Sequence, residues 1–300
     1  MKILAVFLVF LLRQFSVAQP TEFSLPSVSE GEPAAGKRVV IKAPEFANTP
    51  VHHTLYLPQD WDPEWEAKNK SWPVIVEYTG NFYETSGSTG EVEDAGLGYG
   101  ISAGRFIWVV LPFVSSDHQH NERTWWGDER VTVNYAITNV PRICLEFGGD
   151  SRKVLLCGFS RGAIAVNYIG LHNDAIAKLW CGFVSHDHYD GVREWQRTDW
   201  GTPLDKYRAN ATDRLKRLDG RPVLACQSDG IPGARELETY LSGHLAPGSY
   251  KFLKVNMSQI FPSFPNAFAK HPHNDLWLLK DSPDRRVVWN WVDQVIAKAK

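Results

Sequence analysis

The sequence VLLCGFSRGAIAVNYIG occupies residues 154–170. Four apolar residues open it, and mostly small or apolar residues follow Gly162, so it predicts a buried strand that turns sharply into a helix. Ser160 lies at the turn, between Gly158 and Gly162, in the pattern G-x-S-x-G. Glycines suit such a turn because the helix is brought hard against the neighbouring strand. The helix N-terminus behind Ser160 also favours developing negative charge. The stretch therefore predicts a nucleophilic serine.

Apolar runs recur on both sides of this stretch, with helix-like segments between several of them. The middle runs are continuously apolar, as expected for strands covered on both faces. Predicted strands are residues 38–43, 52–58, 73–80, 106–113, 153–160, 179–186, 222–230 and 250–255, and predicted helices are residues 128–147, 161–171, 204–218, 233–242 and 282–299. In the last helix, Ser282 is the expected N-cap and Pro283 the first helical residue. The alternation predicts an α/β fold with a mostly parallel, doubly wound sheet of about eight strands.

Composition favours one globular domain that acts on a small or neutral substrate. The 300 residues are 43% hydrophobic and carry a formal net charge of −2, which suits a single core. The basic residues are spread along the chain without a polybasic run, which argues against a nucleic-acid partner. The sequence does not indicate an oligomeric state.

The first residues have the layout of a signal peptide. Lys2 precedes an apolar run of about ten residues, and small residues end at Ala18, so cleavage is expected there. The run is well short of the ~20 residues that span a bilayer, so no stable membrane insertion is expected after cleavage. The protein is predicted to be secreted or periplasmic, with residues 1–18 as signal peptide, 19–36 as flexible leader and 37–300 as the catalytic domain.

The four cysteines are expected to be unpaired. Cys157, Cys181 and Cys226 lie in apolar runs, where a free cysteine behaves as a small hydrophobe. No C-x-x-C or Cys/His finger spacing is present, so no structural zinc site is expected.

The stretch EFGGDSRKVLLCGFSRGA resembles the α/β-hydrolase superfamily, especially its secreted serine esterases and depolymerases. The resemblance extends from about residue 38 to the C-terminus. It implies a catalytic triad in the chain order nucleophile, acid, histidine, without a cofactor or metal. It also implies no large lid, although residues 87–104 could form a loop over the site and residues 187–203 a small cap.

The resemblance implies an acid in a loop after a later strand. Asp229, in PVLACQSDGIP, is the preferred residue, because the chemistry needs a fixed carboxylate on the far nitrogen of the imidazole. Asp187 and Asp190, which follow the preceding predicted strand, and Glu236 in the next predicted helix remain alternatives.

The resemblance places the base in the last loop before the C-terminal helix, where KHPHNDLW offers His271 and His273. His273 is preferred because Asp275 follows it shortly, as in the family's loop. The implied oxyanion hole combines the backbone N–H groups of Arg161 and Asn81. The Arg161 side chain is a second candidate for the oxyanion, because glucuronoyl esterases are similar in carrying Arg directly after the serine; pairing with a surface carboxylate is the alternative.

These features together predict a serine carboxylic-ester hydrolase. Tryptophans near the predicted strand ends suit sugar rings or aromatic acyl groups; they are Trp125, Trp126, Trp195 and Trp200. Carbohydrate-linked esters, small or polymeric (acetyl, feruloyl or uronoyl), are therefore the favoured substrates. A peptidase or lipase of the same fold, or a non-catalytic binding protein, remains an alternative. A metal-dependent hydrolase using His186, His188 and Asp190 is another, because H-D-H-Y-D matches most of the zinc signature H-x-H-x-D-H.

Overall fold

The computed structural model describes residues 22–262 and 271–299. In these residues, nine strands form one sheet in the order β1-β2-β3-β5-β4-β6-β7-β8-β9. The strands are β1 (Val28–Ser29), β2 (Arg38–Ile41), β3 (His53–Tyr56), β4 (Trp72–Tyr78), β5 (Ile107–Leu111), β6 (Gly149–Phe159), β7 (Gly182–His186), β8 (Val223–Ser228) and β9 (Tyr250–Val255). Only β3 runs antiparallel to its neighbours. The predicted mostly parallel sheet is confirmed; β1 is the strand that the sequence pattern missed.

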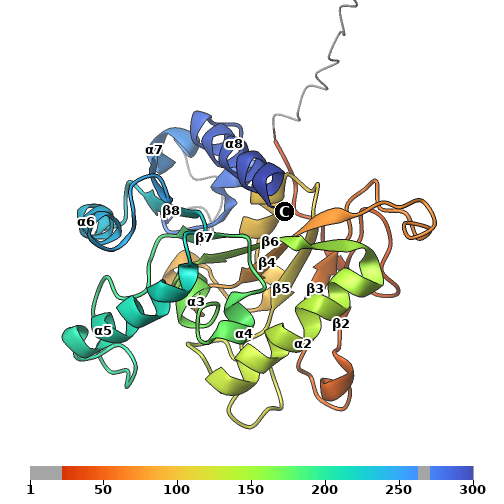
Figure 1. Cartoon of the computed structure of the whole chain (residues 1–300), viewed down its shortest axis with the longest axis horizontal. Helices are drawn as coiled ribbons and strands as arrows, with labels where there is room; N and C mark the ends of the chain where they lie inside the picture. Colours follow the sequence, from red (N-terminus) through yellow and green to blue (C-terminus); the bar gives the residue numbers. More distant parts are fainter. Residues whose placement is uncertain (1–21, 263–270, 300) are drawn as a thin grey trace, which may run out of the picture.

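Helices cover both faces of this sheet. The α-helices are α1 (Leu97–Ser102), α2 (Glu129–Phe147), α3 (Arg161–Tyr168), α4 (Asp174–Ala177), α5 (Leu204–Leu215), α6 (Ala234–His244), α7 (Met257–Ile260) and α8 (Pro283–Lys298). In β6, Val154 and Leu156 face the core shared with α2 and α3, whereas Leu155 and Cys157 face the core shared with α1 and α8. Figure 1 shows α8 on one side of the central strands and α2 and α4 on the other.

The two longest helices begin at side-chain caps. The Asp128 carboxylate accepts the backbone N–H of Val131 at the start of α2, and the Ser282 hydroxyl accepts that of Arg285 at the start of α8. Such caps satisfy N–H groups that have no partner inside the helix. Pro283 occupies the first turn of α8, so the predicted start of the C-terminal helix is confirmed.

The segment expected to be a flexible leader packs on the domain from residue 22 onward. β1 pairs with β2, the Phe23 N–H donates to the Leu279 carbonyl at 2.9 Å, and the Phe23 ring meets Trp289 edge-on at 5.7 Å. The Pro, Ser and Gly content of this segment suggested flexibility, but burial of its aromatic side chain against α8 outweighs that tendency. The predicted cleavage site after Ala18 lies outside the described residues. In the part of the chain that the structure describes, no helix is long and apolar enough to cross a membrane.

The turn from β6 into α3 is forced into an unusual conformation by close backbone packing. Ser160 has φ 54° and ψ −115°, a sparsely populated region for a residue with a side chain. A Cβ on Gly158 would lie 2.1 Å from the Gly162 carbonyl oxygen, and a Cβ on Gly162 would lie 1.8 Å from the Tyr78 carbonyl oxygen. Both distances are far below van der Waals contact, and the atoms met are backbone. The two glycines are therefore required by the sheet, and they hold Ser160 at the strand end.

The Gly162→Ala substitution is expected to lower the free energy of unfolding by about 3 kcal/mol or more, because the added methyl group would displace β4 from α3. Urea denaturation measures this change. Gly243→Ala is the matched control, since Gly243 lies in a helix with nothing within 4 Å of its Cβ position, and there alanine should stabilise by roughly 0.5–1 kcal/mol. Equal stability of the Gly162→Ala variant and the wild type would contradict the packing argument.

Candidate active site

Three side chains, two of them at the carboxyl ends of the neighbouring strands β6 and β7, form a hydrogen-bonded chain. Ser160 Oγ lies 2.8 Å from His273 Nε2, and His273 Nδ1 lies 3.0 Å from Asp187 Oδ2. The carboxylate can only accept, so this contact places a proton on Nδ1 and leaves Nε2 to accept the serine hydroxyl proton. Ser160 follows β6, Asp187 follows β7, and His273 lies between β9 and α8. The arrangement is that of a serine nucleophile, a base and an orienting acid.

Asp187 is built into the site by backbone strain and by hydrogen bonds from the next strand. Its φ is 68°, and its carboxylate accepts the Ser228 N–H at 2.7 Å and the Ser228 hydroxyl at 3.0 Å. Burial by itself would raise the pKa of Asp187, but the adjacent His186, the hydrogen bond from His273 and the Ser228 amide outweigh it and hold the pKa below its usual value. The acid is therefore a fixed, fully buried carboxylate.

The prediction of Asp229 as the acid is wrong in this geometry. The Asp229 carboxylate is on the surface and accepts from the Ser258 hydroxyl at 2.9 Å. Asp187 follows the strand that pairs directly with the serine strand, whereas Asp229 follows the strand beyond it. The loop after the adjacent strand brings Asp187 to His273, whereas the Asp229 carboxylate is turned to Ser258.

The other acidic alternatives also lie elsewhere. Asp190 is buried, but Arg214 takes both of its carboxylate oxygens at 2.7 and 2.9 Å. Glu236 is exposed on α6. Among the four acids considered from the sequence, only Asp187 reaches the histidine.

His271 supports His273 and does not replace it. Nδ1 of His271 accepts the backbone N–H of His273 at 3.1 Å. Its ring lies edge-on to the Tyr83 ring at 6.4 Å. Burial lowers the pKa of His271, and the neighbouring His273 adds to that effect. The structure thus brings the preferred histidine to the serine and places the alternative behind it.

Two backbone N–H groups beside Ser160 are free to bind an oxyanion. Asn81 and Arg161 line one cavity together with Ser160. Within residues 22–262 and 271–299, neither backbone N–H donates to a protein acceptor. The Asn81 side chain instead accepts the Trp125 N–H at 2.8 Å, and its carbonyl accepts the Ser88 hydroxyl at 2.6 Å. These bonds hold Asn81 from both sides and leave its N–H available.

The Arg161 side chain, in contrast, points away from the serine, so neither role considered for it from the sequence fits. Its guanidinium donates to the carbonyls of Trp125 at 2.7 Å and Glu122 at 3.2 Å and lies 4.1 Å from the Phe113 ring centroid. Burial lowers the pKa of Arg161 to about 9, opposed by the charges of Glu122 and Glu91. The buried side chain therefore stabilises the loop around residues 122–125 through these hydrogen bonds.

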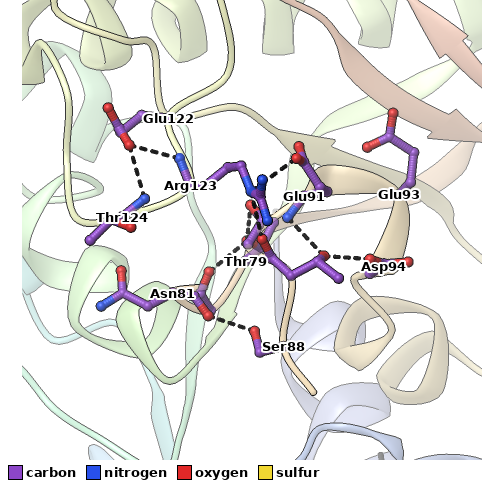
Figure 2. Close-up of polar contacts among 12 residues, drawn as sticks. Thr79, Asn81, Ser88, Glu91, Glu93, Asp94, Glu122, Arg123 and Thr124 are labelled. Carbon is purple, nitrogen blue, oxygen red and sulfur yellow. Dashed lines mark hydrogen bonds and ion pairs between the residues drawn. The ribbon is translucent and has the colours of Figure 1, made fainter. Parts of the chain in front are cut away.

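A polar network joins that loop to the loop that follows β4 (Figure 2). Arg123 forms an ion pair with Glu91 at 3.1 Å, and its backbone carbonyl accepts the Phe82 N–H at 2.8 Å. Thr79 donates its hydroxyl to the Gly90 carbonyl at 3.1 Å. The network fixes both loops against each other at the rim of the site, which keeps the Asn81 N–H in place.

The cavity beside Ser160 has an aromatic lining. Its volume is about 410 Å³, and Trp125 and Trp195 both line it. Their rings meet at 5.1 Å in an edge-to-face arrangement, a geometry that aromatic pairs favour. Of the other two tryptophans considered from the sequence, Trp126 is buried in the core and stacks on Tyr168 at 4.7 Å, and Trp200 packs against Trp125 and Trp126. Residues 187–203, the expected small cap, supply Trp195.

The histidine and aspartate pattern considered as a metal site does not converge. His186 Nε2 lies 2.9 Å from the Asn274 carbonyl, His188 faces the cavity, and the Asp190 carboxylate is bound to Arg214. Among the described residues, no three His, Cys, Asp or Glu side chains are grouped as metal ligands. The four cysteines are free thiols.

No protein-family model and no curated protein sequence matches the chain. Solved structures do match its fold. A sugar hydrolase from Lactococcus lactis aligns with a TM-score of 0.54 at 12% identity, over 88% of this chain and 100% of that one. MGS-M1, an alpha/beta hydrolase enzyme from a deep-sea metagenome library, aligns with a TM-score of 0.50 at 15% identity, over 86% and 98%. The protein has the α/β-hydrolase fold.

A ferulic acid esterase also shares this α/β-hydrolase fold, with a TM-score of 0.50 at 13% identity, over 87% of this chain and 96% of that chain. Among the described residues, the chain has the expected order of serine, acid and histidine, with Asp187 in the middle position. Asp187 follows β7, whereas Asp229, the acid preferred from the sequence, follows β8.

The depressed pKa of Asp187 predicts a pH dependence of stability. The charged form stabilises the fold above the ordinary carboxyl pKa of about 3.9, and this contribution is lost as the pH falls through the lower folded-state pKa. The difference in unfolding free energy between wild type and Asp187→Asn should therefore be constant above about pH 5 and shrink toward pH 3. Urea denaturation across this range measures it.

Asp229→Asn is the matched control, because the Asp229 carboxylate is exposed. Surface substitutions of this kind usually change the free energy of unfolding by no more than about 0.5 kcal/mol. If the difference in unfolding free energy between wild type and Asp187→Asn stays unchanged down to pH 3, the lowered pKa of Asp187 is contradicted.

Proposed function

We propose that the protein is a serine carboxylic-ester hydrolase that works through an acyl-enzyme. The observation that supports this proposal most directly is the hydrogen-bonded chain from Ser160 through His273 to Asp187. The strained turn presents the serine hydroxyl at the strand end, as in other serine hydrolases. The aromatic cavity beside it gives an ester room to bind.

In the proposed reaction, Ser160 Oγ attacks the ester carbonyl carbon while His273 Nε2 accepts the hydroxyl proton. The bond to the alcohol oxygen then breaks, and His273 returns the proton to the departing alcohol. Water attacks the acyl-serine by the same route and releases the acid. Asp187 stays ionised throughout, since its pKa is held low, and it stabilises the imidazolium that forms at each step.

The N–H groups of Asn81 and Arg161 are the proposed donors to the oxyanion. Both have no protein acceptor among the described residues, and both line the cavity that contains Ser160. The Arg161 N–H also stands at the N-terminus of α3, where the helix dipole favours negative charge. The Arg161 side chain contributes indirectly, by holding the loop that carries Trp125.

Carbohydrate-linked esters with an aromatic acyl group are the proposed substrates, with feruloyl esters first. Trp125 and Trp195 present flat apolar faces within the cavity of Ser160, and such faces bind aromatic rings and sugars. The shared fold with a ferulic acid esterase is consistent with this choice. The signal-peptide pattern of residues 1–18 supports a further proposal, that the enzyme is secreted or periplasmic and meets such esters outside the cytoplasm.

Ser160→Ala is expected to lower the turnover of p-nitrophenyl acetate by at least about 10⁴-fold, because the nucleophile is removed. The assay is absorbance of released nitrophenolate with protein whose fold is checked by circular dichroism. Hydrolysis should also survive a chelator and stop with a serine-directed organophosphate. Activity retained by Ser160→Ala, or lost with the chelator, would rule the mechanism out.

Asp187→Asn is expected to lower kcat by about 10⁴-fold, because the amide would favour the wrong histidine tautomer. Asp229→Asn is the control and should keep kcat within about twofold, since Asp229 contacts Ser258 on the surface. The reverse pattern would restore Asp229 as the acid. Comparing kcat/KM for feruloyl, acetyl and uronoyl esters identifies the preferred ester, and a peptide nitroanilide tests whether an amide bond is cleaved as well.

A further inference from the structure

Two cavities meet at His273, and their charges differ. The cavity that contains Ser160 has no Asp or Glu among its described lining residues. The neighbouring cavity, of about 330 Å³, also reaches His273 but is lined by four acidic residues against one arginine, Arg38; the acids are Glu91, Glu93, Asp94 and Asp275. An anionic substrate group is therefore disfavoured on one side of the histidine and not on the other.

Arg193 gives the Ser160 cavity a fixed positive charge. Its guanidinium carbon lies 3.9 Å from the centroid of the Trp195 ring, and both residues line the cavity. Trp195 is itself held edge-on by Trp125 at 5.1 Å. A guanidinium stacked on a braced ring loses little further freedom when it binds a ligand.

No described residue neutralises the charge of Arg193. In residues 22–262 and 271–299, its guanidinium forms no ion pair or hydrogen bond. The adjacent Glu194 carboxylate accepts from the Thr202 hydroxyl instead. Removal from water lowers the pKa of Arg193, and among the described residues no carboxylate opposes this shift.

The other basic side chains at the cavity cannot take this role. The Arg161 guanidinium is turned onto the Trp125 and Glu122 carbonyls. Burial lowers the pKa of His188 well below its ordinary value, and the charge of Arg193 lowers it further. The pKa of His271 is also lowered, and His273 is bound to Ser160 and Asp187, so Arg193 is the available fixed cation among the described lining residues.

We propose that Arg193 is a specificity residue that binds an anionic group, a carboxylate in the first instance, on the molecule that occupies the Ser160 cavity. The guanidinium fork matches a carboxylate in two parallel hydrogen bonds. The preferred substrates are then esters with a second, free carboxylate near the scissile bond, such as half-esters of dicarboxylic acids or esters beside a uronate. This substrate class rests on the proposed ester hydrolase activity, whereas anion binding by Arg193 does not.

The test is a binding measurement that needs no turnover. In the Ser160→Ala background, isothermal titration calorimetry compares 3-phenylpropanoate with 3-phenylpropanamide, which has the same shape without the charge. The carboxylate is expected to bind at least about tenfold tighter, a difference of about 1.4 kcal/mol. Arg193→Gln should remove this preference, and added salt should weaken it.

Arg197→Gln is the matched control, because Arg197 is an exposed arginine four residues away that lines neither cavity. It should keep the preference for the carboxylate. A carboxylate that binds no tighter than the amide, including one that does not bind, overturns the proposal. A preference that survives Arg193→Gln, or that Arg197→Gln also removes, overturns it as well.

A kinetic comparison in the wild-type enzyme, which retains Ser160, then tests which part of the substrate carries the anionic group. Mono-4-nitrophenyl glutarate against 4-nitrophenyl pentanoate tests an anionic acyl group, and 3-acetoxybenzoate against phenyl acetate tests an anionic leaving group. In at least one pair, kcat/KM for the anionic ester should exceed kcat/KM for the neutral ester by more than about tenfold. In Arg193→Gln this ratio should fall toward one. Absence of all ester hydrolysis would refute the proposed function, while the calorimetric result would still decide the role of Arg193.

Discussion

The contact between α3 and the end of β4 is the constraint on which the site depends. Gly162 lies so close to the Tyr78 carbonyl that no side chain can be accommodated, and this approach fixes the start of α3 against the sheet. Ser160 must then adopt a positive φ to join β6 to the helix. The strain is maintained by the surrounding packing, and its result is a hydroxyl that projects from the strand end toward His273.

Two buried charges complete this geometry by different means. Asp187 is a charged acceptor that is satisfied by Ser228 and His273, so its burial is compensated by hydrogen bonds and by a neighbouring histidine. Arg161 is a charged donor that is satisfied by backbone carbonyls and an aromatic face. In both cases the charge orders a loop at the carboxyl edge of the sheet, which is why neither side chain is available for other contacts.

The two cavities divide the surroundings of His273 by charge and by composition. The side that contains Ser160 is aromatic and carries Arg193, whereas the other side is acidic. The loop after β4 separates them, and its network with Arg123 (Figure 2) keeps that boundary in place. A substrate that spans the histidine therefore meets two different chemical environments within one site.

Local sequence patterns determined the strands from residue 38 onward, the ends of α2 and α8 and the serine turn, because each depends on residues close together in the chain. The histidine was expected from the family resemblance. Strand β1 and the docking of Phe23 were not predicted, since they depend on contacts with distant residues. The sequence offered several acids and favoured Asp229. Only the tertiary structure decided for Asp187, because the order of strands in the sheet determines which loop lies beside the serine. The same holds for the arginines at the site: long-range packing turns the Arg161 guanidinium onto backbone carbonyls and stacks that of Arg193 on Trp195.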